Sequence, residues 1–190
     1  PFLTAVRDRS SFLINARVEA EKFPPSFFCC IIILMKKQII FICNGNIERS
    51  VVAAQCLRNI LKEKRIGSKF SVDSYGLQGT KGTTLPKHKH LSEYQKEWKA
   101  TQPILKKLKI DISEHSFQKI TLDIAEKVSV IIAMDEKVFT KNKNALLKQF
   151  TKQKNKIHIF SELTLDHKGV EDPAGSGSKE LHGKVIEKIY

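Results

Sequence analysis

From Met35 onward, short apolar runs rich in β-branched residues alternate with stretches of helical periodicity. The runs at 38–42, 70–72, 128–133 and 157–160 are typical of buried strands in a parallel sheet. Because helical segments separate these strands, the pattern predicts an α/β, three-layer, doubly wound fold with a central four-stranded parallel sheet. Folds of this kind bind their ligands beyond the carboxyl ends of the strands.

The helical segments follow from the spacing of apolar side chains. Residues 50–64 carry them at intervals of three and four, which predicts an amphipathic helix that ends near Gly67. Three further helices are predicted, at 103–108, 135–150 (rich in Lys) and 180–189. Residues 76–98 contain several Gly and polar residues and are predicted to form a long irregular connection.

Residues 1–34 differ from the rest of the chain. Their apolar run continues through Met35, but Lys36 and Lys37 stop it, and it is too short to span a bilayer. A secretory signal is an alternative interpretation, although no small-residue cleavage site follows the run. We expect 1–34 to be an N-terminal extension outside the core fold, and 35–190 to be one domain, for which the length is sufficient. Since the chain begins with Pro1 and ends soon after the last predicted helix begins, we also expect an imperfectly bounded gene product.

The composition narrows the classes of function. Lys and Arg total 33 against 20 Asp and Glu, so the net charge is +13, which favours an anionic substrate or partner. The four cysteines (29, 30, 43 and 56) have no Cys-x-x-Cys spacing, and this excludes a disulfide framework and a zinc set. We therefore expect a cytoplasmic protein with no metal and no cofactor.

The segment after the first predicted strand, 43–50, has the composition of a phosphate cradle. Its backbone N–H groups can converge on one anion at a helix N-terminus, and Gly45 and Asn46 tolerate the left-handed conformations that such a loop needs. Arg49 can grip two phosphoryl oxygens. Cations and a helix N-terminus also favour the thiolate form of Cys43, which can then attack phosphorus.

This segment resembles the active-site signature of the low-molecular-weight protein tyrosine phosphatases. That signature reads Cys, any residue, Gly, Asn, Ile or Thr, usually Cys, then Arg and Ser. Further blocks resemble the family in the same order along the chain, at 72–74, 110–115, 131–136 and 170–173. Residues 80–100 are longer than the usual connection.

The resemblance implies a phosphomonoester hydrolase that forms a phosphocysteine intermediate, and protein tyrosine phosphatase activity on phosphorylated proteins or small aryl phosphates. It makes Cys43 the nucleophile, Arg49 the clamp of the transition state and Asp172 the general acid. Ser50 would donate a hydrogen bond to the sulfur, while Asn46, Ser74 and His115 would hold the loop in shape. The substrate-binding residues that it implies are Asn44, Gly45, Asn46, Ile47, Glu48 and Ser50.

Two features depart from the family pattern. Glu48 stands where the loop usually has a second cysteine, so the protective disulfide of many members cannot form within the loop. If its carboxylate faces the ligand, it would oppose a phosphate by about 2 kcal/mol at roughly 8 Å and an effective dielectric constant near 20, and by less if the side chain points to solvent. Ile47 fits the pattern, which has either an apolar residue or Thr at this position. Because members that hydrolyse phosphoarginine have Thr there, the resemblance implies a preference for aryl phosphates.

The second departure concerns the entrance of the site. Where the family commonly has aromatic residues after Asp-Pro, this chain has Ala, Gly, Ser and Gly at 174–177. Tyr75, Tyr94 or Trp98 could supply an aromatic wall instead.

Two other functions are compatible with the same residues. A thiol-dependent arsenate reductase needs resolving cysteines late in the chain, and none follows Cys56. A phosphate- or nucleic-acid-binding module would use the positive charge, but the basic runs lack interleaved aromatic residues. We expect neither nucleic acid nor membrane as a partner, and the sequence leaves the oligomeric state open.

Overall fold

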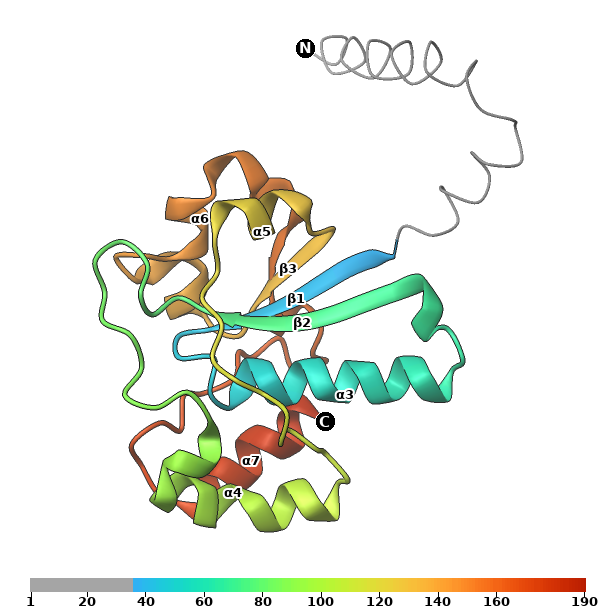
Figure 1. Ribbon diagram of the computed structural model, residues 1–190, viewed down its shortest axis with the longest axis vertical. Coiled ribbons are helices and arrows are strands. Elements are labelled where there is room, and N and C mark those ends of the chain that lie inside the picture. Colours follow the sequence, from blue (N-terminus) through green and yellow to red (C-terminus); the bar gives the residue numbers. More distant parts are fainter. Residues whose placement is uncertain (1–35) are drawn as a thin grey trace, which may run out of the picture. The chain divides into compact units, whose positions relative to one another are not determined.

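The central feature of the structure is a sheet of four parallel strands in the order β2-β1-β3-β4 (Figure 1). This computed structural model describes residues 36–190, so the predictions for 1–34 lie outside the described residues. The sheet confirms the predicted fold class. The strands are β1 (Lys37–Cys43), β2 (Phe70–Gly76), β3 (Val130–Ala133) and β4 (Ile157–Ile159).

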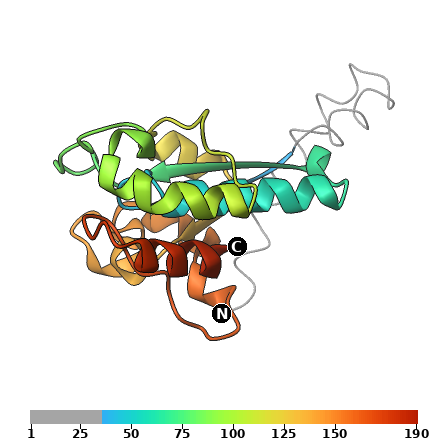
Figure 2. The same ribbon diagram turned by 90° about the horizontal axis from the view of Figure 1, so that it is seen from below.

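Helices cover both faces of the sheet, as a doubly wound fold requires (Figures 1 and 2). On one face lie α3 (Arg49–Glu63), α4 (Gln95–Lys107) and α7 (Lys179–Ile189), and α7 packs against both other helices. On the other face lie α5 (Leu122–Lys127) and α6 (Leu146–Gln149). Shorter turns are a π turn at Lys137–Lys141 and 3-10 turns at Gly67–Lys69, Leu91–Glu93, Thr151–Lys156 and Phe160–Glu162.

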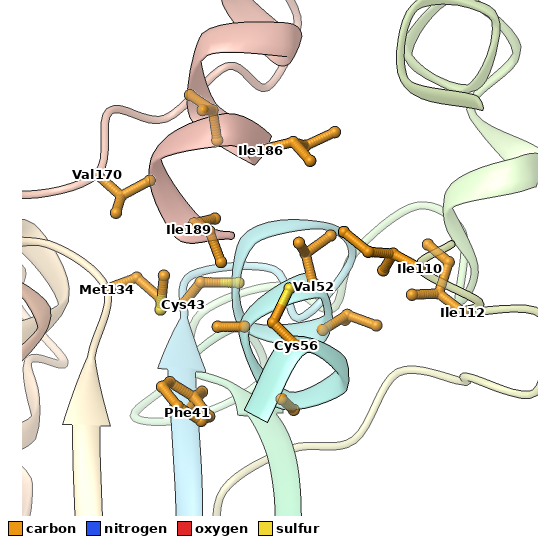
Figure 3. Packing of buried hydrophobic residues seen from close by; sticks show 14 of the residues in the cluster. Phe41, Cys43, Val52, Cys56, Ile110, Ile112, Met134, Val170, Ile186 and Ile189 are labelled. Carbon is orange, nitrogen blue, oxygen red and sulfur yellow. The ribbon is translucent and has the colours of Figure 1, made fainter. Parts of the chain in front are cut away.

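Strand β1 supplies alternate side chains to two separate apolar clusters. Phe41 and Cys43 pack with α3 and α7, whereas Ile40 and Ile42 pack with α5 and α6. Figure 3 shows the first cluster, where Cys43 lies at the tip of β1 among apolar residues of the surrounding elements. Burial of each large aliphatic side chain contributes about 1.5 to 3 kcal/mol, so both faces hold β1 in the centre of the sheet. The carboxyl end of β1, which carries Cys43, is therefore held in place from both faces of the sheet.

Two predicted segments differ from the structure between β2 and β3. Residues 76–98 are not irregular throughout, because α4 begins at Gln95 and encloses the predicted helix at 103–108. Pro103 lies within α4 on its exposed side, where the carbonyl that loses a partner can bind water. The short helix α5 was not predicted; it begins after Thr121, whose hydroxyl accepts a hydrogen bond from the Ile124 amide.

The predicted helix at 135–150 is wrong. The segment consists of the π turn, a further turn at 142–145 and the four-residue helix α6. The cause is Asn144, which is buried and donates to the Leu77 carbonyl and the Thr80 hydroxyl at 3.0 Å each. These contacts with the connection after β2 replace the continuous helix that the spacing of apolar residues suggested.

In this described part of the chain, no helix is long and apolar enough to cross a membrane.

Candidate active site

The loop between β1 and α3 is held by one buried side chain, that of Asn46. Asn46 has φ 50°, in the left-handed region that Asn tolerates. Its side-chain Nδ2 donates to the Ser50 hydroxyl at 3.1 Å and to the Ser74 hydroxyl at 2.9 Å. Its side-chain Oδ1 accepts from the backbone amide of Gln118 at 2.8 Å. The loop is therefore tied to α3, to β2 and to the segment before α5.

The end of β2 also comes close to this loop. A Cβ placed at Gly76 would lie 3.0 Å from the Asn46 side chain and 3.1 Å from the Asn44 carbonyl. Glycine at this position therefore lets the loop pack directly on the strand.

His115 fixes the loop from the opposite side. Its Nε2 lies 2.8 Å from the Asn46 carbonyl oxygen, and since a carbonyl can only accept, this nitrogen carries the proton. Burial lowers the pKa of His115 and outweighs the hydrogen bond, so the ring is neutral near pH 7.

The Cys43 sulfur lies at the carboxyl end of β1 and accepts two hydrogen bonds. The Asn46 backbone amide and the Ser50 hydroxyl each donate to Sγ at 3.1 Å. Two donors thus converge on the sulfur, in the arrangement that stabilises negative charge on an acceptor atom. The hydrogen bond expected from Ser50 is present.

The Arg49 guanidinium, buried at the start of α3, faces three oxygen-bearing groups. It contacts the Asp135 carboxylate through Nη1, donates to the Val170 carbonyl at 3.3 Å and lies 2.5 Å from the Asp172 carboxylate through Nη2. Burial alone would lower the pKa of Arg49, but the charges of Cys43 and the two aspartates outweigh it and raise that pKa. The guanidinium is thus a fixed positive charge next to Cys43.

Asp135 is a site residue that the sequence reasoning did not assign. It follows β3, the neighbour of β1, and its Oδ1 accepts from the Val138 amide at 2.8 Å while its Oδ2 contacts Arg49. Both contacts orient Arg49 toward the loop. The available signal was an acidic residue at the carboxyl end of a strand, which is where ligands of parallel sheets bind.

Glu48 does not have the orientation that the sequence suggested. Instead of facing a phosphate without a counter-charge, its carboxylate contacts His182 of α7, with Nδ1 2.9 Å from each oxygen. Both side chains are buried. The sequence analysis considered Glu48 without a partner, whereas in the structure its carboxylate is paired with the imidazole of His182.

One cavity of about 240 Å³ joins most of the predicted site residues. Among the candidate residues, those that line it are Cys43, Asn44, Gly45, Ile47, Glu48, Arg49 and Asp172. The supporting residues Asn46, Ser50, Ser74 and His115 are joined by the hydrogen bonds described above and do not line it. The structure thus brings together segments that lie more than a hundred residues apart in the chain.

The cavity wall includes one of the three aromatic candidates. Tyr94 lines it together with Leu91 and the small residues Ala174 and Gly175. Tyr75 instead packs in the apolar cluster on the other face of the sheet, and Trp98 packs against the cluster of α3 and α7. The aromatic surface at this site comes from the connection after β2.

Comparison with known families agrees with this geometry. Residues 38–190 match the family described as low molecular weight phosphotyrosine protein phosphatase. No curated protein matches the chain significantly.

Solved structures share the fold. The low molecular weight protein tyrosine phosphatase from T. tengcongensis is 24% identical with a TM-score of 0.61, over 81% of this chain and 92% of that one. YfkJ from Bacillus subtilis is 22% identical with a TM-score of 0.60, over 82% and 90%. The YwlE arginine phosphatase, phosphorylated on an active-site serine, is 21% identical with a TM-score of 0.60, over 80% and 88%.

The family match extends over most of the chain and includes the loop that surrounds Cys43. It does not favour the arsenate reductase or the binding module. The chain belongs to the low molecular weight phosphotyrosine protein phosphatase family and is a cysteine-dependent phosphatase.

Proposed function

We propose that the chain hydrolyses aryl phosphates, phosphotyrosine among them, with Cys43 as nucleophile, Arg49 as clamp and Asp172 as general acid. The single observation that carries this proposal is the Cys43 sulfur, which accepts two hydrogen bonds in the same cavity as the Arg49–Asp172 pair. A nucleophile, a cation for the phosphoryl oxygens and a proton donor are the three groups that this reaction requires.

The reaction proceeds in two displacements. In the first, the Cys43 thiolate attacks phosphorus while the bond to the leaving oxygen breaks, and protonated Asp172 gives that oxygen its proton. In the second, the Asp172 carboxylate takes a proton from water as the water oxygen attacks the phosphocysteine, and the thiolate leaves. The Ser50 hydroxyl, which donates to Sγ, stabilises this departing anion.

Loop amides and Arg49 hold the phosphoryl oxygens during both steps. A loop at a helix N-terminus presents its N–H groups to an anion, and a guanidinium offers two parallel donors. Asp135 and the Val170 carbonyl keep Arg49 oriented, which reduces the reorganisation needed when the transition state forms. Asn44, Gly45, Ile47 and Glu48 complete the binding surface.

An aryl substrate suits the walls of the cavity. Ile47 is half-buried and offers an apolar surface, and Tyr94 offers an aromatic one. YwlE is named as an arginine phosphatase, so phosphoarginine is the competing substrate class for this fold. A flat apolar contact favours a phenyl ring over a guanidinium.

We also propose a cytoplasmic location, and residues 35–190 as the catalytic domain. A reducing compartment keeps thiols such as those of Cys43 and Cys56 from forming disulfides. In the described range, Cys43 and Cys56 are both free thiols.

The test is turnover of p-nitrophenyl phosphate by the full chain, with two matched variants. Cys43→Ser should abolish turnover but keep the affinity for vanadate, because a serine hydroxyl is not ionised at neutral pH. Cys56→Ser, which alters a buried thiol outside the cavity, should remain active. Equal turnover in wild type and Cys43→Ser would overturn the proposal.

A further inference from the structure

Glu48 places a carboxylate in the wall of a cavity that binds an anion. The residue is only 7% exposed and lies directly before Arg49 in the phosphate loop. A buried negative charge at this position needs a counter-charge, because water cannot screen it and a phosphate dianion would be repelled. The cavity therefore needs a group that neutralises Glu48.

His182 is the group that meets this requirement. It lies on α7, is fully buried, and points Nδ1 at both carboxylate oxygens of Glu48 at 2.9 Å. Burial alone would lower the pKa of His182, but the hydrogen bond and the charge of Glu48 outweigh it, so the pKa of His182 is raised. Burial raises the pKa of Glu48, and the contact with His182 opposes that effect.

The other charges around the pair do not replace His182. Arg49 is engaged by Asp135 and Asp172, and the groups that face His182 besides Glu48 are the carboxylates of Glu97 on α4 and Asp172. Among the described residues, His182 is the ion-pair partner that Glu48 has. The carboxylates of Glu97 and Asp172 favour the imidazolium form of His182, and this imidazolium neutralises Glu48.

The contact also joins two distant parts of the site. Glu48 belongs to the loop that carries Cys43, whereas His182 lies ten residues beyond Asp172, on the helix that follows the Asp172 segment. α7 in turn packs against α3 and α4. The pair therefore connects the phosphate loop to the helix that anchors the segment of the general acid.

We propose that His182 is a positioning residue that neutralises Glu48 and fixes the phosphate loop to α7, so that the cavity can accept a dianion. This rests on the proposed function, because it assumes that the cavity binds phosphate. It predicts that the carboxylate of Glu48 harms anion binding only when His182 cannot pair with it.

Phosphate binding to the full chain, measured by isothermal titration calorimetry, tests the pair without requiring turnover. His182→Leu should weaken phosphate binding by roughly 10- to 30-fold, the effect of one uncompensated charge several ångströms away. His182→Asn keeps a neutral donor and should fall between wild type and His182→Leu. Glu48→Gln in the His182→Leu background should restore binding to within about threefold of wild type, because no carboxylate remains to repel the ligand.

A matched control is Lys184→Ala on the same helix, which breaks the exposed Lys184–Glu180 ion pair and should leave phosphate binding unchanged. Circular dichroism shows whether each variant folds. If His182→Leu does not fold, phosphate binding to His182→Asn and the pH dependence of the wild type test the role of His182 instead.

The pH dependence is measured with sulfate, which stays dianionic throughout the neutral range. Because the pKa of His182 is raised, neutralisation of Glu48 is complete at low pH and is lost as the pH rises through that pKa. Sulfate affinity should therefore fall at a higher pH in wild type than in Glu48→Gln, where no Glu48 carboxylate raises the pKa of His182. Both proteins keep the other ionisable side chains of the cavity, so the difference between their profiles reports the Glu48–His182 pair.

Two results would overturn the inference. One is unchanged phosphate affinity in a folded His182→Leu. If that variant does not fold, the equivalent result is unchanged affinity in His182→Asn together with identical pH profiles for wild type and Glu48→Gln. The other is a double variant that remains as weak as His182→Leu, since this would show a purely structural loss. A wild type that binds phosphate without turning over aryl phosphates would instead contradict the proposed function and leave this test intact.

Discussion

Asp172 lies at the edge of the cavity, where its side chain is 35% exposed and contacts Arg49. At this place it can exchange protons with solvent between the two displacements. Asp172→Asn should slow phenyl phosphate by about 100-fold or more, but p-nitrophenyl phosphate far less, because nitrophenolate leaves without a proton. Matched kcat values for the two substrates measure the effect, and equal slowing of both would contradict the role of general acid.

Ile47 is the residue that we expect to set the preference for aryl substrates. Partial burial of a side chain of this size contributes about 1 to 2 kcal/mol, or about 5- to 30-fold in selectivity. Ile47→Thr should lower kcat/KM for phosphotyrosine relative to phosphoarginine by that factor. If the wild type already prefers phosphoarginine, the aryl assignment fails while the phosphatase assignment stands.

Oxidation tests the consequence of Glu48 at a position that is usually cysteine. Cys56 is buried, and burial raises the pKa of its thiol to about 11, so it is a poor nucleophile toward an oxidised Cys43. In a Cys29→Ser/Cys30→Ser background, peroxide should convert Cys43 to the sulfinic acid, with activity that dithiothreitol does not restore.

Mass spectrometry of the Cys43 peptide detects the two added oxygen atoms. Glu48→Cys, which returns a thiol to the loop, should make the inactivation reversible. Full recovery of the Glu48-containing protein in dithiothreitol would show that another reaction protects Cys43.

At the scale of elements, Asn144 holds two connections together. Its buried amide bonds the Leu77 carbonyl and the Thr80 hydroxyl, which joins the connection after β2 to the segment before α6. Asn144→Leu removes both of these hydrogen bonds, each of which contributes about 0.5 to 1.5 kcal/mol, and should lower the free energy of unfolding by about 1 to 3 kcal/mol.

Urea denaturation measures this change. The control is Asn155→Ala, an exposed position where a change within about 0.5 kcal/mol is expected. A loss at Asn144 no larger than at Asn155 would show that the two connections are held by other contacts.

The same elements show why some of the fold could be predicted and some could not. Strands β1 and β3 and helix α3 are long or strongly patterned, and their burial agrees with their apolar spacing. The segment 135–150 has helical spacing as well, but the long-range contacts of Asn144 override it. Propensity and spacing are local signals, and a buried polar contact to a distant loop is not among them.

At the scale of the whole molecule, the candidate site also has one part that the sequence predicts and one part that it does not. The Cys43 loop is contiguous in sequence, so its residue types alone predict a phosphate cradle. The partners of that loop are distant: Asp135 lies 86 residues from Arg49, and His182 lies 134 residues from Glu48. A single sequence carries no signal for such a pair, and this is why Glu48 was expected to repel phosphate.

The proposed reaction requires that Cys43 forms a covalent phosphocysteine. The most direct test is rapid acid quench of the full chain during turnover of p-nitrophenyl phosphate, followed by mass spectrometry of the peptide that contains Cys43. We expect phosphate on Cys43, a burst of nitrophenolate that matches it, and residual turnover in Cys43→Ser below about a hundredth of wild type. Turnover without any phosphorylated Cys43, or a Cys43→Ser variant that retains activity, would contradict it.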